Sequence, residues 1–311
     1  MTDAQARSHT PGHRFRQAIE VERPLEIAGA VNALCARMAE HAGFLALYLS
    51  GAGVANASHA LPDLGVTTLA DVLEDARRIT AATDLPLLVD ADTGWGSPLT
   101  IRRTVRELSR AGVAGMHLED QVEAKRCGHR AGKQLVTTEV MQDRIQAALD
   151  ARTDETFVLM ARTDAVSVEG LDAAIERAGR YVETGADMIF AEALTSLDEY
   201  RQFTKAVSVP VLANITEFGR TPLFTREELA SAGIRMVLYP LSAFRAMNAA
   251  ADHVYRTLKS EGTQRGLLEQ MQTREELYEL LDYESDERSS QPERSSQPSV
   301  VSVQPEGTHP E

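Results

Sequence analysis

The chain has 311 residues, of which 43% are hydrophobic, so it is long enough for two ordinary domains or for one large α/β barrel. Its formal net charge is −14 and it contains no long basic run, which argues against a nucleic-acid-binding surface. Two cysteines are too few for a secreted disulfide scaffold, and no stretch approaches the roughly 18 consecutive apolar residues of a membrane span.

Residues 1–13 are polar and lack the apolar segment of a signal peptide, so we expect a cytoplasmic protein with a disordered N-terminus. After them, short apolar runs rich in β-branched residues alternate with amphipathic stretches. The eight runs are LEIAGAVN (25–32), FLALYLSG (44–51), PLLVDADTG (86–94), GMHLEDQ (115–121), FVLMARTD (157–164), MIFAEAL (188–194), VPVLANIT (209–216) and MVLYPLS (236–242).

Stretches of helical period, several of them ending in glycine, lie between these runs, for example at 69–83, 101–112 and 171–185. Strands that are apolar throughout are typical of a parallel sheet. Eight strand–helix units predict a closed (β/α)8 TIM-type barrel, with a doubly wound sheet as the alternative. Two further helical stretches, 243–260 and 265–282, could cap the barrel or reach a partner subunit.

The segment 284–311 differs from the rest of the chain. It contains few apolar residues, and ERSSQP occurs in tandem at 287–292 and 293–298. Such a segment cannot bury enough surface to offset the entropy lost on ordering. We therefore expect a disordered acidic tail after one barrel domain that covers residues 14–283.

Each predicted strand is apolar first and polar last. In a (β/α)8 barrel the carboxyl ends of all strands meet at one mouth, where such enzymes hold their catalytic residues. This pattern is the strongest indication of an enzyme in the residues themselves. The polar residues expected around the mouth are Asn32, Ser50, Asp90, Asp92, Glu119, Arg162, Asp164, Glu192, Asn214 and Thr216.

Asp90 and Asp92 are two residues apart on one strand, so their side chains point to the same side of the sheet. Two adjacent carboxylates repel each other unless a cation separates them. Hard oxygen ligands suit Mg²⁺, or Mn²⁺, and Glu119 could hold the ion through a water. The alternative is that the two aspartates cap helices or form salt bridges.

Arg162 ends a buried strand, where an unpaired cation is costly. It could clamp a substrate carboxylate with two hydrogen bonds, or form an internal ion pair with Asp164 or Glu192. Asn214 and Thr216 could donate hydrogen bonds to carboxylates, or they could cap the next turn.

Cys127 lies in the sequence KRCGH (125–129), whereas Cys35 lies in a helical pattern and is expected in the core. Positive charge from Lys125 and Arg126 favours the thiolate, so we expect Cys127 to be partly ionised and able to exchange protons near neutrality. The chain lacks the further ligands of a tetrahedral zinc site and the nucleophile elbow of a hydrolase. The alternative is a surface thiol in a basic loop.

The segment AKRCGH (124–129) resembles the signature of the isocitrate lyase and phosphoenolpyruvate mutase superfamily, in its lyase branch. The resemblance covers about residues 15–283. Mutases and phosphonopyruvate hydrolases lack this cysteine, and isocitrate lyases are longer, so the chain is most similar to the branch that cleaves 2-methylisocitrate. The other similar segments are YLSGAG (48–53), LPDLG (61–65), LVDADTGWG (88–96), HLEDQ (117–121), MARTDA (160–165), NITEFG (214–219), YPLSAFRAMN (239–248), EGTQ (261–264) and MQTREELY (271–278).

This resemblance implies a Mg²⁺-dependent retro-Claisen cleavage of a small tricarboxylate, 2-methylisocitrate, to pyruvate and succinate in propionate breakdown. Asp90 and Asp92 would hold the ion, and Cys127 would protonate the succinate carbanion. We expect the Cys127 thiol to be partly ionised in the free protein and protonated in the complex, because the negative charge of the substrate raises the thiol pKa. Tyr48, a second carboxylate or a metal-bound water could take the hydroxyl proton. The implied substrate contacts are Ser50, Gly51, Ala52, Gly128, His129, Arg162, Glu192, Asn214, Ile215, Thr216, Arg245 and Arg274.

The chain departs from the family pattern at Ala52, Trp95 and Ala191, where Gly, Phe and Pro are expected. The alternative activity is that of an isocitrate lyase, which gives glyoxylate and succinate; Phe190 and Leu238 are candidates for the pocket that would distinguish the two substrates. A silent barrel used for assembly or carboxylate sensing is disfavoured by the intact aspartate pair and cysteine. The resemblance also implies a homotetramer that exchanges its late helices between subunits.

Overall fold

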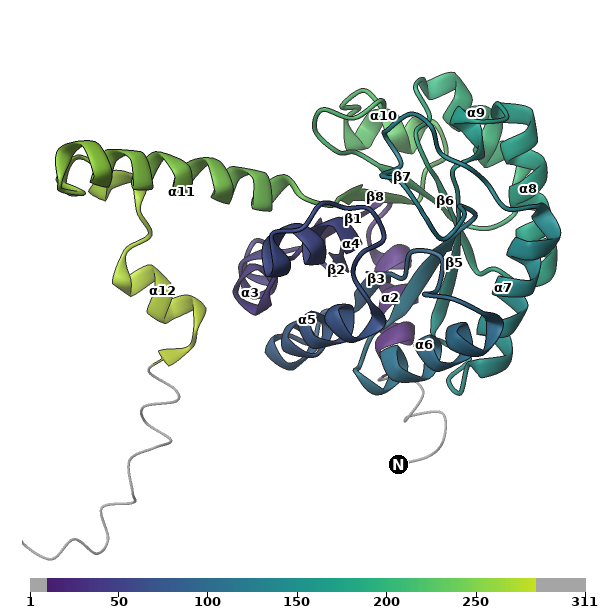
Figure 1. Ribbon diagram of the computed structural model, residues 1–311, viewed down its shortest axis with the longest axis horizontal. Helices are drawn as coiled ribbons and strands as arrows, with labels where there is room; N and C mark the ends of the chain where they lie inside the picture. Colours follow the sequence, from purple (N-terminus) through teal and green to yellow (C-terminus); the bar gives the residue numbers. More distant parts are fainter. Residues whose placement is uncertain (1–9, 284–311) are drawn as a thin grey trace, which may run out of the picture. The chain divides into compact units, whose positions relative to one another are not determined.

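The computed structural model describes residues 10–283 and contains a closed barrel of parallel strands (Figure 1). Neighbouring strands pair in chain order, and the last strand pairs with the first to close the ring. The predicted (β/α)8 barrel is confirmed, and the doubly wound alternative is wrong. The strands are β1 (Leu25–Gly29), β2 (Ala46–Leu49), β3 (Leu87–Asp90), β4 (Gly115–Glu119), β5 (Val158–Thr163), β6 (Met188–Ala191), β7 (Val211–Asn214) and β8 (Met236–Tyr239).

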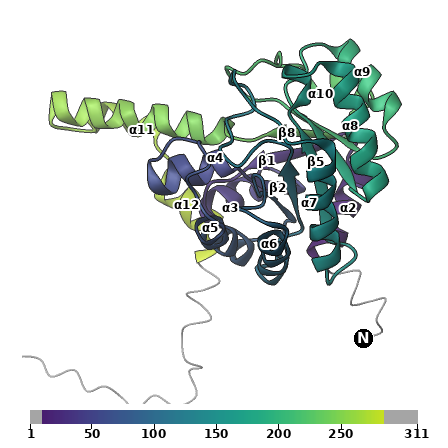
Figure 2. The same ribbon diagram turned by 45° about the vertical axis from the view of Figure 1, so that its right-hand side comes forward.

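A helix follows each strand, and those after β2 to β7 surround the barrel (Figure 2). Short helical turns follow β2 and β5 at the barrel mouth, namely α4 (Gly51–Gly53), η1 (Val54–Ser58) and η2 (Ala165–Ser167). The longer helices are α3 (Ala33–His41), α5 (Leu69–Ala82), α6 (Pro98–Arg110), α7 (Thr138–Ala151), α8 (Leu171–Thr184), α9 (Leu197–Ala206), α10 (Arg226–Ser231) and α11 (Ser242–Glu261).

The helix α2 (Pro11–Val21) begins inside the segment 1–13 for which we expect disorder. Thr10 caps this helix, because its side chain accepts a hydrogen bond from the His13 N–H (3.3 Å), and a proline occupies the first helical position. The prediction of disorder is therefore wrong for residues 11–13. The rest of that segment and the predicted tail lie outside the described residues.

The segment predicted as one helix at 265–282 is broken into two. Thr273 starts the second piece with a capping box, in which its side chain and that of Glu276 each accept a hydrogen bond from the other residue's backbone N–H. The pieces are η3 (Arg265–Gln270) and α12 (Arg274–Leu280). One compact unit of the chain ends at Gly266 and a second begins at Leu267. The single domain predicted over 14–283 stays a prediction.

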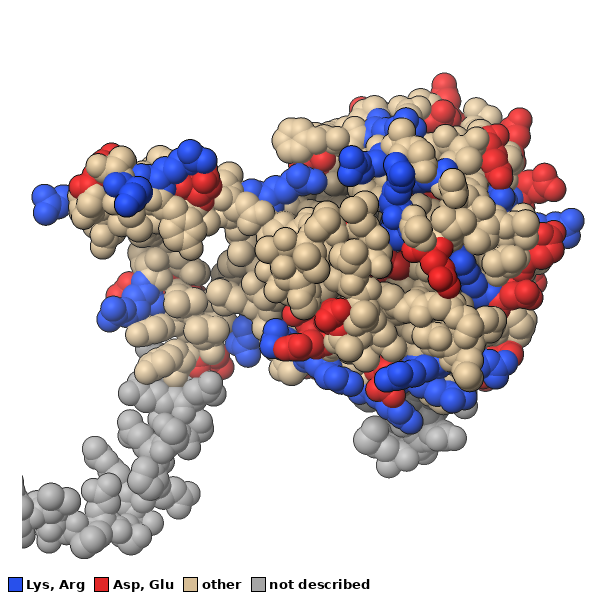
Figure 3. Space-filling model, in the orientation of Figure 1, with Lys and Arg blue, Asp and Glu red and all other residues tan. Residues whose placement is uncertain are grey.

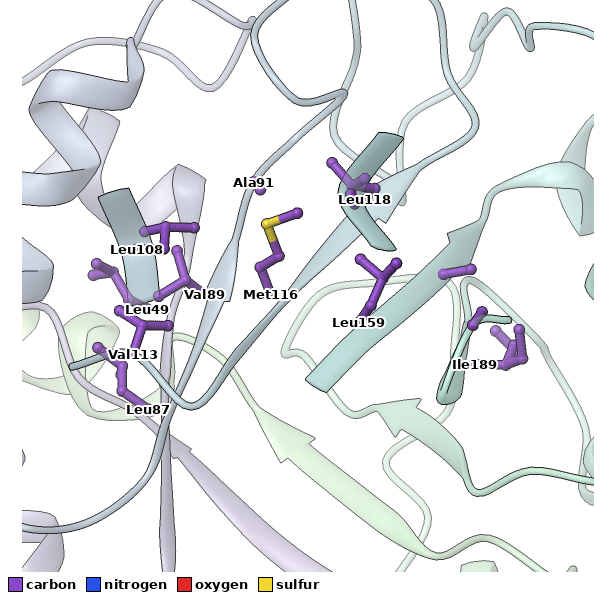
Figure 4. Close-up of a cluster of buried hydrophobic side chains, with 14 of the residues drawn as sticks. Leu49, Leu87, Val89, Ala91, Leu108, Val113, Met116, Leu118, Leu159 and Ile189 are labelled. Carbon is purple, nitrogen blue, oxygen red and sulfur yellow. The ribbon is translucent and has the colours of Figure 1, made fainter. Parts of the chain in front are cut away.

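Two apolar layers hold the barrel together. Side chains such as Leu25 and Met160 fill the inside of the ring. Side chains such as Val89, Met116 and Leu159 pack between the strands and the outer helices (Figure 4). Because successive side chains of a strand point to opposite faces, the next inward-facing residues at the carboxyl ends are the polar ones. The fold thus gathers these polar residues at one mouth.

The helix α11 extends away from the barrel, and none of its residues is buried (Figure 1). Met247, Tyr255 and Leu258 are exposed on it. On the face shown in Figure 3, acidic and basic side chains intermingle over the barrel. Among residues 10–283, no helix combines the length and the apolar character needed to cross a membrane.

Candidate active site

A cavity of about 340 Å³ lies at the carboxyl ends of the strands. Its walls come from β2, β3, β5 to β8 and the loop that carries Cys127. Both candidates for the methyl pocket, Phe190 and Leu238, also line it. The predicted site residues that line this cavity are Tyr48, Ser50, Ala52, Asp90, Cys127, Gly128, His129, Arg162, Glu192, Asn214, Thr216 and Arg245.

A larger cavity of about 650 Å³ lies beside the first, against the beginnings of α5 and α6. Asp92 and Lys125 reach it, but none of the predicted substrate contacts does. The smaller cavity is therefore the candidate active site, because the thiol, Arg162 and the carboxylates of Asp90 and Glu192 converge there.

Besides Asp92, four predicted residues do not line the smaller cavity. Gly51 donates its backbone N–H to Asp90 Oδ2 (3.0 Å), and Ile215 is buried in the hydrophobic core. Glu119 is also buried, beneath the cavity residue Arg162. Arg274 belongs to the second compact unit, so its approach to the mouth stays a prediction.

Asp90 and Asp92 face a common space beside Gly51. A Cβ atom placed on Gly51 would lie 3.1 Å from Asp90 Oδ2 and 3.2 Å from Asp92 Oδ1. Asp92 has a positive φ of 46°, and its N–H donates to Asp90 Oδ1 (3.0 Å). Aspartate is one of the few side chains that adopts this left-handed conformation readily. Because β3 ends at Asp90, the expectation that both aspartates lie on one strand is wrong. The turn after β3 instead brings both carboxylates to the side of Gly51, which has no side chain of its own.

These acids fit a hard divalent cation. Asp92 Oδ1 and Glu119 Oε1 are buried oxygens without a hydrogen-bond partner, although Asp92 Oδ1 lies 2.7 Å from Lys125 Nζ. No cluster of three or more His, Cys, Asp or Glu side chains within residues 10–283 forms a complete ligand set. An ion held here would therefore need water or substrate oxygens as well, as Mg²⁺ commonly does.

The two aspartates differ in their pKa. Burial acts to raise the pKa of Asp90, but Lys125 and Arg162 oppose this effect, and the net result is a lowered pKa. Burial and the charge of Asp90 raise the pKa of Asp92 to about 7. The pair therefore behaves as one firmly ionised carboxylate beside a second that ionises with more difficulty.

Lys125 lies at the centre of this acidic cluster. Its ammonium is 2.5 Å from Asp63 Oδ1 and 2.7 Å from Asp92 Oδ1, and its side chain is 5% exposed. Burial acts to lower the pKa of Lys125, but the surrounding carboxylates raise it by more. The net pKa is raised, so Lys125 stays charged. Sequence reasoning left the role of Lys125 open and assigned none to Asp63, whose only signal was its place in the family segment LPDLG.

Arg162 makes the predicted internal ion pairs and also lines the cavity, whereas its contact with a substrate carboxylate stays a prediction. Its Nε lies 3.0 Å from Asp164 Oδ2 and 3.4 Å from Glu119 Oε2, and its Nη2 lies 3.2 Å from Glu192 Oε2. The guanidinium also lies over the Phe190 ring, 5.0 Å from its centroid. These contacts fix the guanidinium plane at the cavity wall.

The expectation of a partly ionised Cys127 thiol is wrong. Cys127 is half-buried, and burial raises its pKa. The nearby positive charge does not act as the sequence suggests, because Lys125 is paired with Asp63 and Asp92. Arg126 is exposed, and its guanidinium donates instead to the carbonyl of the loop residue Ala131 (3.4 Å). The thiol is therefore protonated at neutral pH.

Tyr48 has a partner that sequence reasoning missed. Its hydroxyl lies 2.8 Å from His117 Nε2, and the same nitrogen lies 3.6 Å from Asp90 Oδ1. Burial raises the pKa of Tyr48 well above its ordinary value and lowers that of His117 to about 4. Both groups are thus neutral at pH 7. The available signal was that His117 stands two residues before Glu119 on one strand, and so shares its inward face.

His129 holds the far side of the cavity. Its Nε2 lies 3.3 Å from Asn214 Nδ2 and 3.2 Å from Glu192 Oε1, and its Nδ1 accepts a hydrogen bond from the Arg220 N–H (3.0 Å). Arg245, at the start of α11, lies 3.5 Å from Glu217 at the rim.

The fold and the site define a (β/α)8-barrel protein with carboxylates, buried cations and one thiol around a single mouth. Residues 15–259 match the family model described as phosphoenolpyruvate phosphomutase. The chain is 62% identical over 276 residues to 2-methylisocitrate lyase of Escherichia coli (strain K12), across 88% of this chain and 93% of that protein. A 2-methylisocitrate lyase of Aeropyrum pernix is 46% identical, across 89% of each chain. The chain therefore belongs to the phosphoenolpyruvate mutase and isocitrate lyase superfamily, and within it to the 2-methylisocitrate lyases.

Solved structures agree with this assignment, which confirms the resemblance seen in the sequence. A 2,3-dimethylmalate lyase superposes with a TM-score of 0.84 at 36% identity, across 90% of this chain and 94% of that one. A phosphonopyruvate hydrolase in complex with oxalate and Mg²⁺ superposes with a TM-score of 0.78 at 30% identity, across 90% and 96%.

Proposed function

We propose that this chain cleaves 2-methylisocitrate to pyruvate and succinate, in the methylcitrate route of propionate breakdown. The observation that carries the proposal is the convergence of Cys127, Arg162 and Asp90 on one cavity, in a chain 62% identical to a curated 2-methylisocitrate lyase. The reaction must remove a hydroxyl proton, break a C–C bond and protonate the carbanion that forms.

Asp90 and Asp92 would hold Mg²⁺ or Mn²⁺, with Glu119 contributing through a water. The Mg²⁺ in the related phosphonopyruvate hydrolase supports this proposal, as does the buried Glu119 Oε1, which has no hydrogen-bond partner. Bound there, the ion would supply Lewis acidity to the substrate oxygens.

Ser50, Gly51 and Ala52 would hold the half of the substrate that becomes pyruvate, together with Arg162. The Ser50 side chain makes no capping hydrogen bond to the short helix that follows it, so its hydroxyl is available to a ligand. Arg162 is oriented before the substrate arrives by its pairs with Asp164 and Glu192. A preset guanidinium loses little freedom when it binds a carboxylate.

Tyr48 would help to remove the hydroxyl proton. Because its pKa is raised well above the ordinary value, Tyr48 enters the reaction as a neutral phenol. To accept a proton it must pass its own to His117, which lies 2.8 Å away and is neutral. A buried carboxylate or a metal-bound water is the alternative base.

Cys127 would donate the proton that completes succinate. When the C–C bond breaks, its electron pair stays on the succinate half, and that carbon takes the thiol proton and leaves a thiolate. A proton donor must be protonated before the substrate binds, and the raised pKa of Cys127 meets this requirement.

The succinate carboxylates would contact the far wall of the cavity, where hydrogen-bond donors and one carboxylate meet. The residues proposed for this half are Gly128, His129, Glu192, Asn214, Thr216 and Arg245, with the Ile215 backbone and Arg274. Phe190 and Leu238 would contact the substrate methyl group.

We also propose a homotetramer in which α11 packs on a neighbouring subunit. A lone helix of this length gains most of its stability from packing one face, whereas α11 buries none of its residues within the chain. Light scattering would give the oligomeric state, and a monomer at micromolar concentration would overturn the proposal.

The deciding experiment measures pyruvate from 2-methylisocitrate and glyoxylate from isocitrate, each with Mg²⁺ and with a chelator. We expect a much higher kcat/KM for 2-methylisocitrate and no turnover after chelation. Equal or greater activity on isocitrate would assign the alternative function.

A further inference from the structure

The loop that carries Cys127 is held by side chains and not by a strand or helix of its own. It joins β4 to α7 and contains only an isolated bridge between Gln121 and Leu135. Within the loop, the Arg130 N–H donates to the Cys127 carbonyl (2.9 Å) and closes a tight turn. The position of the thiol therefore depends on what anchors this turn to the barrel.

Two buried polar side chains from outside the turn hold the backbone of the two residues on either side of Cys127. Gln121 is fully buried; its Nε2 donates to the Arg126 carbonyl (2.9 Å), and its Oε1 accepts from the Arg126 N–H (3.0 Å). Lys133 donates from Nζ to the Gly128 carbonyl (2.6 Å), and its side chain is 1% exposed. Positions 126 and 128 are thus both fixed, one residue before and one residue after the cysteine.

Lys133 also connects the turn to the substrate-binding arginine. Its Nζ donates to Asp164 Oδ1 (2.7 Å), and Asp164 in turn accepts from Arg162 Nε (3.0 Å). Arg162 pairs with three carboxylates. Lys133 is a second cation beside one of them, Asp164, and therefore weakens the attraction between Asp164 and the Arg162 guanidinium. The Lys133 ammonium therefore both fixes the position of the turn and partly neutralises the carboxylates that pair with Arg162.

The turn has little room to move sideways. A Cβ on Gly128 would lie 2.6 Å from Glu192 Oε2 and would overlap Arg162 Nη2. The backbone of the turn therefore lies directly against the residues that line the cavity. Lys125 and His129 also tie this segment to the barrel, so the loss of either anchor would loosen the turn without freeing it, and the thiol would become more mobile.

We propose that Gln121 and Lys133 are positioning residues that clamp the backbone of Arg126 and Gly128, the neighbours of Cys127, and so aim its thiol into the cavity. Neither side chain lines the cavity, so both act through the turn. The proposal rests on the role of Cys127 as proton donor. Gln121→Met and Lys133→Met remove the clamps at similar side-chain length. Arg152→Met is the matched control, because it breaks a partly buried pair with Asp187 (2.7 Å) that does not involve the loop.

The experiment measures the alkylation rate of Cys127 by iodoacetamide, with peptide mass spectrometry to separate it from Cys35. A loosened turn exposes the thiol more often, so we expect the rate constant to rise about tenfold in both clamp variants. Pyruvate plus succinate should protect Cys127 less well than in the wild type. We expect kcat to fall about tenfold or more in both clamp variants. KM should change little in Gln121→Met, because Gln121 contacts neither the substrate cavity nor Arg162. In contrast, Lys133→Met should also change KM through Asp164 and Arg162.

Arg152→Met should match the wild type in alkylation rate and in kcat. If Cys127 of a clamp variant is alkylated no faster than Cys127 of this control, the positioning role of that residue is wrong. If Lys133→Met does not fold, Gln121→Met alone decides the proposal. If the wild type fails to cleave 2-methylisocitrate, the proposed function falls, whereas the alkylation rates still test the clamp.

Discussion

Gly128→Ala should damage activity far more than stability. Gly128 does not have the positive φ that would exclude alanine, so the backbone accepts the substitution. The obstacle is space, because the new methyl group would lie 2.6 Å from both Glu192 Cγ and Glu192 Oε2 and would overlap Arg162 Nη2. Neither side chain can move aside at low cost in free energy, because Arg162 is held by three carboxylates and Glu192 is 1% exposed.

The cost of such overpacking is typically about 1–3 kcal/mol. The loop can relieve this overpacking by moving away from the cavity wall. The closed arrangement that catalysis needs is therefore destabilised, whereas the free energy of unfolding of the barrel changes little. At about 1.4 kcal/mol per factor of ten, kcat/KM for 2-methylisocitrate should fall about 5- to 150-fold, while the melting temperature stays close to that of the wild type.

The assay is pyruvate formation over a range of 2-methylisocitrate concentrations, together with thermal unfolding. Gly179→Ala is the control, because a Cβ at this position of α8 would meet no atom within 4 Å, and alanine favours the helix. A Gly128→Ala enzyme with kcat/KM within about twofold of the wild type would refute the close contact between the turn, Arg162 and Glu192.

Three further predictions follow from the site. Cys127→Ser should bind succinate, as measured by calorimetry, but lose almost all pyruvate formation; a near-normal kcat would exclude the thiol as proton donor. Because burial disfavours the thiolate and raises the pKa of Cys127, the rate of its alkylation in the wild type should still be rising above pH 9, beyond the ordinary thiol pKa of about 8.5. A rate that levels off below pH 7 would contradict this. Asp90→Ala should lose both activity and Mn²⁺ binding measured by electron paramagnetic resonance, and metal-independent cleavage by the wild type would be evidence against the metal site.

Most of the site could be predicted because barrel strands share one direction. Arg162 and Asn214 end different strands far apart in the chain, yet both line the cavity, as expected when all carboxyl ends meet. A contact between the Ile215 backbone and the substrate stays a prediction. Ile215 belongs to the matched segment NITEFG, but it follows the inward-facing Asn214 and its side chain packs in the core.

The errors at the termini have a different origin. The sequence suggests disorder up to residue 13, but one threonine cap and one proline suffice to start α2 at Pro11. The predicted helix at 265–282 contains a second such cap at Thr273, which begins a new helix. Both caps are visible in the sequence, but each involves only three or four residues. The periodic patterns used to place the helices extend over longer segments, so they do not detect such caps.

Strand periodicity, strand direction and local segments are properties of neighbours along the chain, and they predict the barrel, most of the residues at its mouth and the family. The tertiary structure sets the state of the key groups. It pairs Lys125 with Asp63 and Asp92, joins Tyr48 to His117, and raises the pKa of Cys127 despite its basic neighbours. These results depend on burial and on distances between residues remote in the chain, and a charge adjacent in sequence has little effect once another residue neutralises it.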